Sequence, residues 1–83
     1  MSNYKFDVQL LLEGSTTSAK TVSEHITKNF TGDCLMVVGD ESLLKLHFHT
    51  NTPWEILAYC ASLGNIYDII VENMHRQANG LKG

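Results

Sequence analysis

One stretch decides the fold: residues 43–55, which read LLKLHFHTNTPWE. Its first half alternates, with apolar residues at 44, 46 and 48 and polar residues at 45, 47 and 49. This alternation predicts a strand over 43–49 with one face in the core. The second half begins a helix, because Thr52 takes the N-cap position, Pro53 the first helical position and Glu55 the third. A threonine and a glutamate at this spacing predict a capping box, in which each side chain satisfies a free backbone N–H.

The sequence on either side of this stretch predicts four further elements. They are a strand over 4–12, a helix over about 17–29, a strand over 34–38 that forms a hairpin with 43–49, and a last strand over 65–73. Gly64 is expected to end the helix that starts at Pro53. The order β-α-β-β-α-β predicts an α+β, ferredoxin-like sandwich: a four-stranded antiparallel sheet of order 4-1-3-2, with both helices on one face. We expect a single domain over residues 1–75 and a flexible tail over 76–83.

Composition and charge exclude several classes of protein. Six Lys and Arg against nine Asp and Glu leave a formal net charge of -3, which argues against a general nucleic-acid binder. No apolar run approaches the roughly 20 residues that a membrane-spanning helix needs, and the N-terminal residues do not resemble a signal peptide. Cys34 and Cys60 are too few for a disulfide framework. We expect both to be reduced core residues, and the protein to be cytoplasmic.

Three side chains are candidate metal ligands. The predicted topology makes the first and third strands neighbours, so Asp7, His47 and His49 would converge on the sheet face that no helix covers. A His-x-His pair on a strand projects both imidazoles to one side, and a carboxylate beside them completes a set of ligands that zinc accepts. The alternative is that these residues are ordinary polar side chains on an exposed sheet face, since a metal site also needs suitable geometry and supporting contacts.

The uncovered face is predicted to be apolar elsewhere, with Leu11, Leu35, Val37 and Ile70 on it. A small domain with such a face commonly buries it against a second copy or another domain, so we expect a homodimer or a piece of a larger protein. The alternative for 34–38 is a short strand that is buried on both faces. The sequence has no Gly-rich phosphate-binding loop, so we assign no nucleotide site to it.

Several of these motifs resemble one known family. The stretches Gly32-Asp33-Cys-Leu-Met-Val-Val-Gly-Asp40-Glu41, Lys45-Leu-His47-Phe-His49-Thr-Asn-Thr-Pro53 and Glu72-Asn-Met74 resemble the middle domain of DAK-type (dihydroxyacetone-kinase-like) proteins. The resemblance is to the ATP-binding subunit of bacterial fatty-acid kinase, and it covers nearly the whole chain. Lys-x-His-x-His-Thr-Asn-x-Pro is its most specific part.

The resemblance implies a set of partners and a metal. In that family an ATP-binding domain precedes the middle domain, and the protein works with a DegV-type protein that holds the fatty acid. The middle domain is implicated in dimerisation and in binding zinc through the His-x-His pair and a cysteine of the first strand. The resemblance carries over His47 and His49, whereas the cysteine position falls on Asp7, an aspartate that can also bind zinc.

Three functions are therefore open. The leading hypothesis is a non-catalytic accessory and dimerisation domain that binds a metal, and that phosphorylates nothing alone because these 83 residues contain no ATP-binding domain. A small zinc-dependent hydrolase-like domain is the second, with Asp7, His47 and His49 holding the ion. A small-molecule regulatory module is the third.

Overall fold

The predicted order of strands and helices is confirmed, with one helix added at the end. The structure is a computed structural model that describes residues 3–83. Its elements are β1 (Phe6–Glu13), α1 (Ala19–Asn29), β2 (Gly32–Gly39), β3 (Leu43–Thr50), α2 (Pro53–Leu63), β4 (Asn65–Asn73) and α3 (Met74–Ala78). The first two residues of the predicted domain, 1 and 2, lie outside the described residues.

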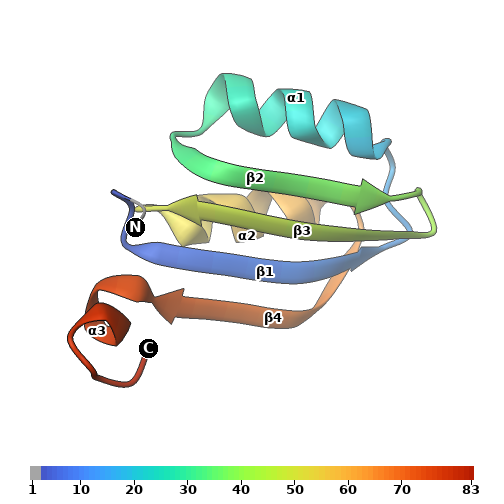
Figure 1. The fold of residues 1–83 in the computed structure, drawn as a ribbon. Helices are drawn as coiled ribbons and strands as arrows, with labels where there is room; N and C mark the ends of the chain where they lie inside the picture. Colours follow the sequence, from blue (N-terminus) through green and yellow to red (C-terminus); the bar gives the residue numbers. More distant parts are fainter. Residues whose placement is uncertain (1–2) are drawn as a thin grey trace.

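The four strands form one antiparallel sheet in the order β2-β3-β1-β4, which is the predicted 4-1-3-2 order read from the other edge (Figure 1). Helices α1 and α2 cover the same face, where their buried residues Val22, Ile26, Ile56 and Cys60 share one core with the apolar residues of β1 and β3. Alternation along β1 and β3 produces this one-sided core, because successive side chains of a strand point to opposite faces. The ferredoxin-like α+β fold is confirmed, and no helix in residues 3–83 is long and apolar enough to cross a membrane.

The predicted start of α2 is right in position and wrong in mechanism. Pro53 is the first helical residue, but the Thr52 side chain makes no capping hydrogen bond, so the predicted capping box does not form. The backbone carbonyl of Thr52 instead accepts a hydrogen bond from Glu55 N at 3.0 Å. The reason lies just upstream, where the buried hydroxyl of Thr50 accepts from Thr52 N at 3.2 Å and holds this corner of the chain.

Gly64 follows α2 at a close approach between two chain segments. A Cβ at this position would lie 2.6 Å from the carbonyl oxygen of Glu13, at the end of β1. Its φ of 175° is ordinary extended backbone. Glycine is therefore needed at this position because no side chain fits, and not because of its backbone conformation.

Two β-bulges change which residues face the open side of the sheet. One is in β4 at Asp68, where the pairing with β1 shifts between Gln9 and Leu11. In β2 the register shifts between Asp33 and Met36, and this shift overturns the predicted placement of Leu35 and Val37, which pack against the core. Met36 and Val38 take their place on the open face, 42% and 48% exposed. Cys34 lies at the same bulge and is exposed, so the prediction that it is a core residue is wrong, whereas Cys60 is buried as predicted.

The C-terminal segment contains a helix that the sequence does not predict. Within the expected flexible tail and just before it, the structure places residues 74–78 in α3, which follows the end of β4 beside the start of β1 (Figure 1). Asn73 caps this helix by accepting from Arg76 N at 3.0 Å. Met74 N donates to Lys5 O at 2.8 Å, which ties α3 to the segment before β1.

Candidate metal centre on the open sheet face

The register of β1 with β3 brings the three predicted ligands together. Asp7 pairs with His49 and Gln9 with His47, so all four side chains have the parity that points away from the helices. The neighbouring residues of opposite parity, Val8 and Phe48, are buried in the core. The core therefore anchors both strands directly under the cluster.

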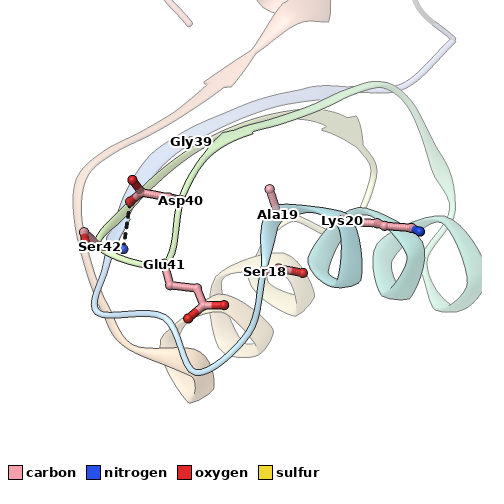
Figure 2. Close-up of a pocket in the computed structure, with 7 residues that line it drawn as sticks. All are labelled: Ser18, Ala19, Lys20, Gly39, Asp40, Glu41 and Ser42. Carbon is pink, nitrogen blue, oxygen red and sulfur yellow. Dashed lines mark hydrogen bonds between the residues drawn. The ribbon is translucent and has the colours of Figure 1, made fainter.

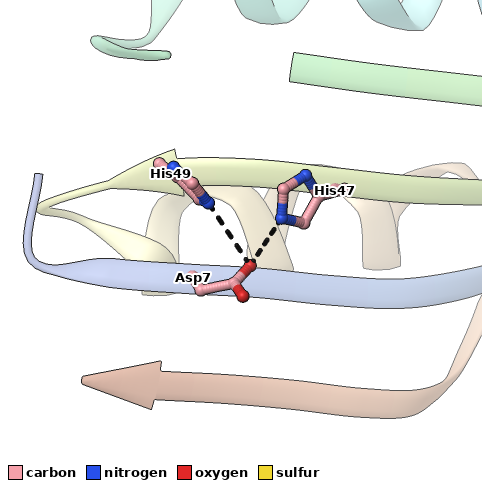
Figure 3. A group of neighbouring side chains, drawn as sticks. All are labelled: Asp7, His47 and His49. Carbon is pink, nitrogen blue, oxygen red and sulfur yellow. Dashed lines mark ion pairs between the residues drawn. The ribbon is translucent and has the colours of Figure 1, made fainter. Parts of the chain in front are cut away.

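The Asp7 carboxylate lies between the two imidazole rings (Figure 3). Its Oδ1 atom is 2.9 Å from His47 Nε2 and 3.9 Å from His49 Nε2. The rings are close to perpendicular, with centroids 4.8 Å apart. The side chains of Asp7, His47 and His49 are 18%, 26% and 16% exposed, so the cluster is largely sheltered from water yet reachable from it.

Two atoms of this cluster, Asp7 Oδ1 and His49 Nδ1, are buried and make ion-pair contacts but no hydrogen bond of good geometry. The other carboxylate oxygen of Asp7 accepts from Gln9 Nε2 at 3.3 Å, which holds the carboxylate in its orientation. A buried polar atom without a hydrogen bond costs free energy, on the order of 1–3 kcal/mol. Native proteins leave few such atoms, and an ion is one of the partners that satisfies them.

The donor set fits a zinc ion. Asp7, His47 and His49 each offer one ligand atom, and these atoms lie within 4.8 Å of one another. Zinc bonds of roughly 2.0–2.2 Å in tetrahedral geometry require ligand atoms about 3.4 Å apart. The two distances from Asp7 Oδ1 to the histidine Nε2 atoms, 2.9 Å and 3.9 Å, lie on either side of that spacing. Two imidazole nitrogens and one carboxylate oxygen would leave a fourth position for water or another group.

Two residues beside this cluster, Asp33 and Cys34, escape prediction from the sequence. Asp33 Oδ1 lies 3.3 Å from His49 Nδ1, on the opposite side of the ring from Asp7. The sequence predicts a core residue at Cys34 and places Asp33 just before the strand over 34–38. Only the pairing of Asp33 with His49 across β2 and β3 reveals their position, and no signal in the sequence marks the bulge that creates it.

The two cysteines differ in surroundings. Desolvation and the Asp33 carboxylate raise the pKa of the Cys34 thiol, which argues against Cys34 as a reactive nucleophile. Burial raises the pKa of the Cys60 thiol to about 11. Cys60 is therefore an inert residue of the core.

A hollow of about 540 Å³ lies away from the metal-ligand cluster (Figure 2). The start of α1 and the turn between β2 and β3 line it, with Lys20 on the first segment and Asp40 and Glu41 on the second. Asp40 Oδ1 accepts from Ser42 N at 2.9 Å, so this carboxylate closes the turn between β2 and β3. None of the candidate metal ligands borders this hollow.

One histidine has a contact that the sequence does not predict. His25, on the outer side of α1, stacks on Tyr59 of α2 with ring centroids 4.2 Å apart and an interplanar angle of 12°. Phe30 completes the contact with its ring 5.9 Å from Tyr59. This group joins the two helices on their solvent side.

Comparison with known families identifies the domain. Residues 3–81 match the FakA-like family of fatty acid kinase middle domains. The chain belongs to this family. The sequence-based resemblance to the fatty-acid-kinase middle domain is thereby confirmed at the level of the family, whereas the specific assignment to a DAK-type protein that binds ATP stays a prediction.

Longer proteins contain a matching segment. Protein YloV of Bacillus subtilis is 44% identical to this chain over 46 residues, and Uncharacterized protein SH1689 of Staphylococcus haemolyticus is 41% identical over 46 residues. Each match covers 55% of this chain and 8% of the relative. The chain thus corresponds to a small part of these relatives.

Proposed function

We propose that this domain is an accessory, non-catalytic module of a fatty-acid-kinase-like protein and that Asp7, His47 and His49 bind a zinc ion on its open face. Membership of the middle-domain family supports the first part. The second part rests on one observation, the position of Asp7 Oδ1 between the Nε2 atoms of His47 and His49.

A zinc ion at this position would join β1 to β3. It would replace the ion pair between Asp7 Oδ1 and His47 Nε2 with bonds from all three side chains to the ion. It would also hold the two imidazoles and the carboxylate at fixed positions on the face of the sheet. Because the ligands converge only in the folded sheet, zinc would bind the native state and stabilise it by mass action.

Elemental analysis of the protein, purified without chelator, tests the metal site. We expect close to one zinc per chain from this site, and the loss of one equivalent in His47→Ala. Lys45→Ala is the matched control, since Lys45 lies on the same strand and the same face but contributes no ligand atom. Equal zinc content in wild type and His47→Ala would refute the site.

An Asp7→Cys variant tests the identity of the third ligand. Cysteine is a better zinc ligand than aspartate in structural sites, where thiolate and imidazole predominate. We expect the zinc affinity of Asp7→Cys to rise and that of Asp7→Ala to fall by more than about tenfold, as even indirect supporting contacts contribute about this much. Unchanged affinity in both variants would show that Asp7 is not a ligand.

The open face also supports association, and we propose a homodimer through it. Exposed apolar side chains flank the polar cluster on both sides, with Met36 and Val38 on one edge strand and Tyr67 and Ile70 on the other. Burying such a face favours a self-complementary, two-fold pairing. Ile70→Ser should weaken a dimer in analytical ultracentrifugation, whereas Trp54→Ser, which changes an exposed apolar residue of α2, should not. A monomer at all concentrations would refute this association.

The partners of a complete protein are part of the same proposal. An ATP-binding domain of the DAK type would supply the nucleotide chemistry, and a DegV-type protein would present the fatty acid. The zinc-dependent hydrolase, the regulatory module and the cytoplasmic location stay predictions. Turnover of a model phosphoester by the zinc-loaded chain, lost in His49→Ala, would favour the hydrolase over the accessory role.

A further inference from the structure

A second group of potential metal ligands lies beside the first. Asp33, Cys34 and His49 each offer one ligand atom, and these atoms lie within 4.8 Å of one another. The group contains one oxygen, one sulfur and one nitrogen donor from two neighbouring strands. Neither Asp7 nor His47 belongs to it.

The backbone at Cys34 is unusual for a strand. The register pairs Asp33 with His49 and Met36 with His47, so two residues of β2, Cys34 and Leu35, oppose the single residue Phe48 of β3. In a regular strand, adjacent residues would point to opposite faces. The bulge instead brings the side chains of residues 33 and 34 to one place beside His49.

Cys34 adopts this conformation against its own preference. Its φ is 54°, in the left-handed region that costs an ordinary side chain energy. Among residues 3–83, the other positions with positive φ are Gly14, Gly39, Gly80 and Asp68, all residue types that accept this region readily. Cysteine has no such preference. A strained backbone that survives beside a cluster of donor atoms is a signature of functional sites.

His49 can serve both groups because its two ring nitrogens point in different directions. Nε2 faces Asp7 at 3.9 Å, and Nδ1 faces Asp33 at 3.3 Å. Nδ1 is buried and makes no hydrogen bond, although a carboxylate lies this close. The ring therefore presents a buried nitrogen to the Asp33 and Cys34 side as well.

We propose that Asp33, Cys34 and Nδ1 of His49 form a second binding site for a divalent metal ion of the zinc type. Mixed nitrogen, sulfur and oxygen donors favour such a borderline-soft ion over magnesium or calcium, which prefer oxygen alone. The Cys34 thiol loses its proton to solvent when the ion binds, and the thiolate becomes the ligand. With both sites filled, the His49 ring also loses its proton and bridges the two ions.

This site goes beyond the proposed function and does not depend on it. Two of its ligands, Asp33 and Cys34, lie on β2, and neither Asp7 nor His47 contributes to it. Its third ligand atom is Nδ1 of His49, whereas the first site uses Nε2. Failure of the first site would leave Asp33, Cys34 and His49 as a complete three-donor set. Failure of the second site would leave Asp7, His47 and His49 intact.

Titration of the metal-free chain with Co²⁺ distinguishes the two sites, because only the second contains sulfur. We expect two equivalents to bind and a thiolate-to-cobalt charge-transfer band to appear in the near ultraviolet. The band should persist in His47→Ala, which loses one equivalent, and vanish in Cys34→Gly and Cys34→Ser, which lose the other. Cys60→Ala is the matched control and should retain the band, since Cys60 is buried in the core.

Cys34→Gly keeps the test independent of folding. Glycine accepts a positive φ without strain, so the metal-free variant should melt at a higher temperature than wild type while its binding at the second site weakens by more than about tenfold. A single equivalent of Co²⁺ without a thiolate band would overturn the proposal. In that outcome, a lower affinity of Asp33→Asn for Co²⁺ would show that Asp33 orients His49, which then acts only as a ligand of the first site. A band that persists in Cys34→Gly would also overturn it.

Discussion

The buried hydroxyl of Thr50 is predicted to contribute strongly to stability, because it fixes the end of β3, the strand that positions His49. Thr50 is 0% exposed. Its Oγ1 donates to Thr31 O at 2.9 Å and accepts from Thr52 N at 3.2 Å. A third, longer contact joins it to Thr52 Oγ1 at 3.4 Å and is weak at this length. Thr50→Val keeps the shape of the side chain and removes both hydrogen bonds, so it leaves a carbonyl and an N–H unsatisfied without opening a cavity.

The expected cost follows from these two contacts. An unsatisfied polar group in a protein interior costs about 1–3 kcal/mol. Thr31 lies at the surface, where water can reach part of its backbone, so we take the lower part of this range for each group. Thr50→Val should then lower the free energy of unfolding by roughly 2–3 kcal/mol. For a domain of this size that corresponds to a fall in melting temperature of roughly 10–20 °C.

Urea denaturation followed by circular dichroism measures this cost, with Thr52→Ala as the control. The Thr52 side chain makes no capping hydrogen bond, and its one polar contact, with Thr50 Oγ1, is 3.4 Å long. Its removal should therefore change stability by less than about 0.5 kcal/mol. A capping box would make the same change cost about 1 kcal/mol. A Thr50→Val protein as stable as wild type would refute the reasoning for Thr50, and a costly Thr52→Ala would restore the capping box.

Three further predictions concern other parts of the fold. Burial raises the pKa of Cys60 from 9.0 to about 11, so the native state keeps this proton to a higher pH than the unfolded chain does. The free energy of unfolding should therefore fall by up to about 3 kcal/mol as pH rises from 9 to 11. Urea denaturation across this pH range checks the fall, and an equal fall in Cys60→Ala would contradict it. Gly64→Ala would place a Cβ 2.6 Å from Glu13 O and should cost roughly 1–3 kcal/mol, so an unchanged thermal melt would disprove the close approach. The stack of His25 on Tyr59 should yield a coupling free energy of about 0.5–1.5 kcal/mol in a double-mutant cycle, and additive single variants would show that the rings do not interact.

The candidate zinc site was predictable because it lies on regular structure. Residues of β1 and β3 alternate without interruption along their pairing, from Phe6 opposite Thr50 to Glu13 opposite Leu43. In such strands the parity of a residue in the sequence determines the face on which its side chain lies. Once the β-α-β-β-α-β order made these strands neighbours, Asp7, His47 and His49 had to meet. Whether they bind zinc is a question of chemistry that parity does not answer.

The second group of ligands was not predictable for the opposite reason. One extra residue at the Cys34 bulge cancels the relation between parity and face. Because of this residue, Leu35 and Val37 pack against the core and not on the open face, and Cys34 is exposed. The bulge at Asp68 in β4 acts in the same way, since Tyr67 and Ile70 are both paired with open-face residues of β1 although they differ in parity.

The sequence by itself therefore determined the order of the elements, the one-sided core and the face on which the His-x-His pair lies. These depend on local periodicity and on the rule that a strand's side chains alternate. The tertiary structure alone decided where the strands bulge, how Thr50 replaces a capping box at the start of α2, and which residues approach the second nitrogen of His49. Each of these depends on contacts between residues far apart in the chain, such as Asp33 with His49 and Thr50 with Thr31, whose energies no local pattern records.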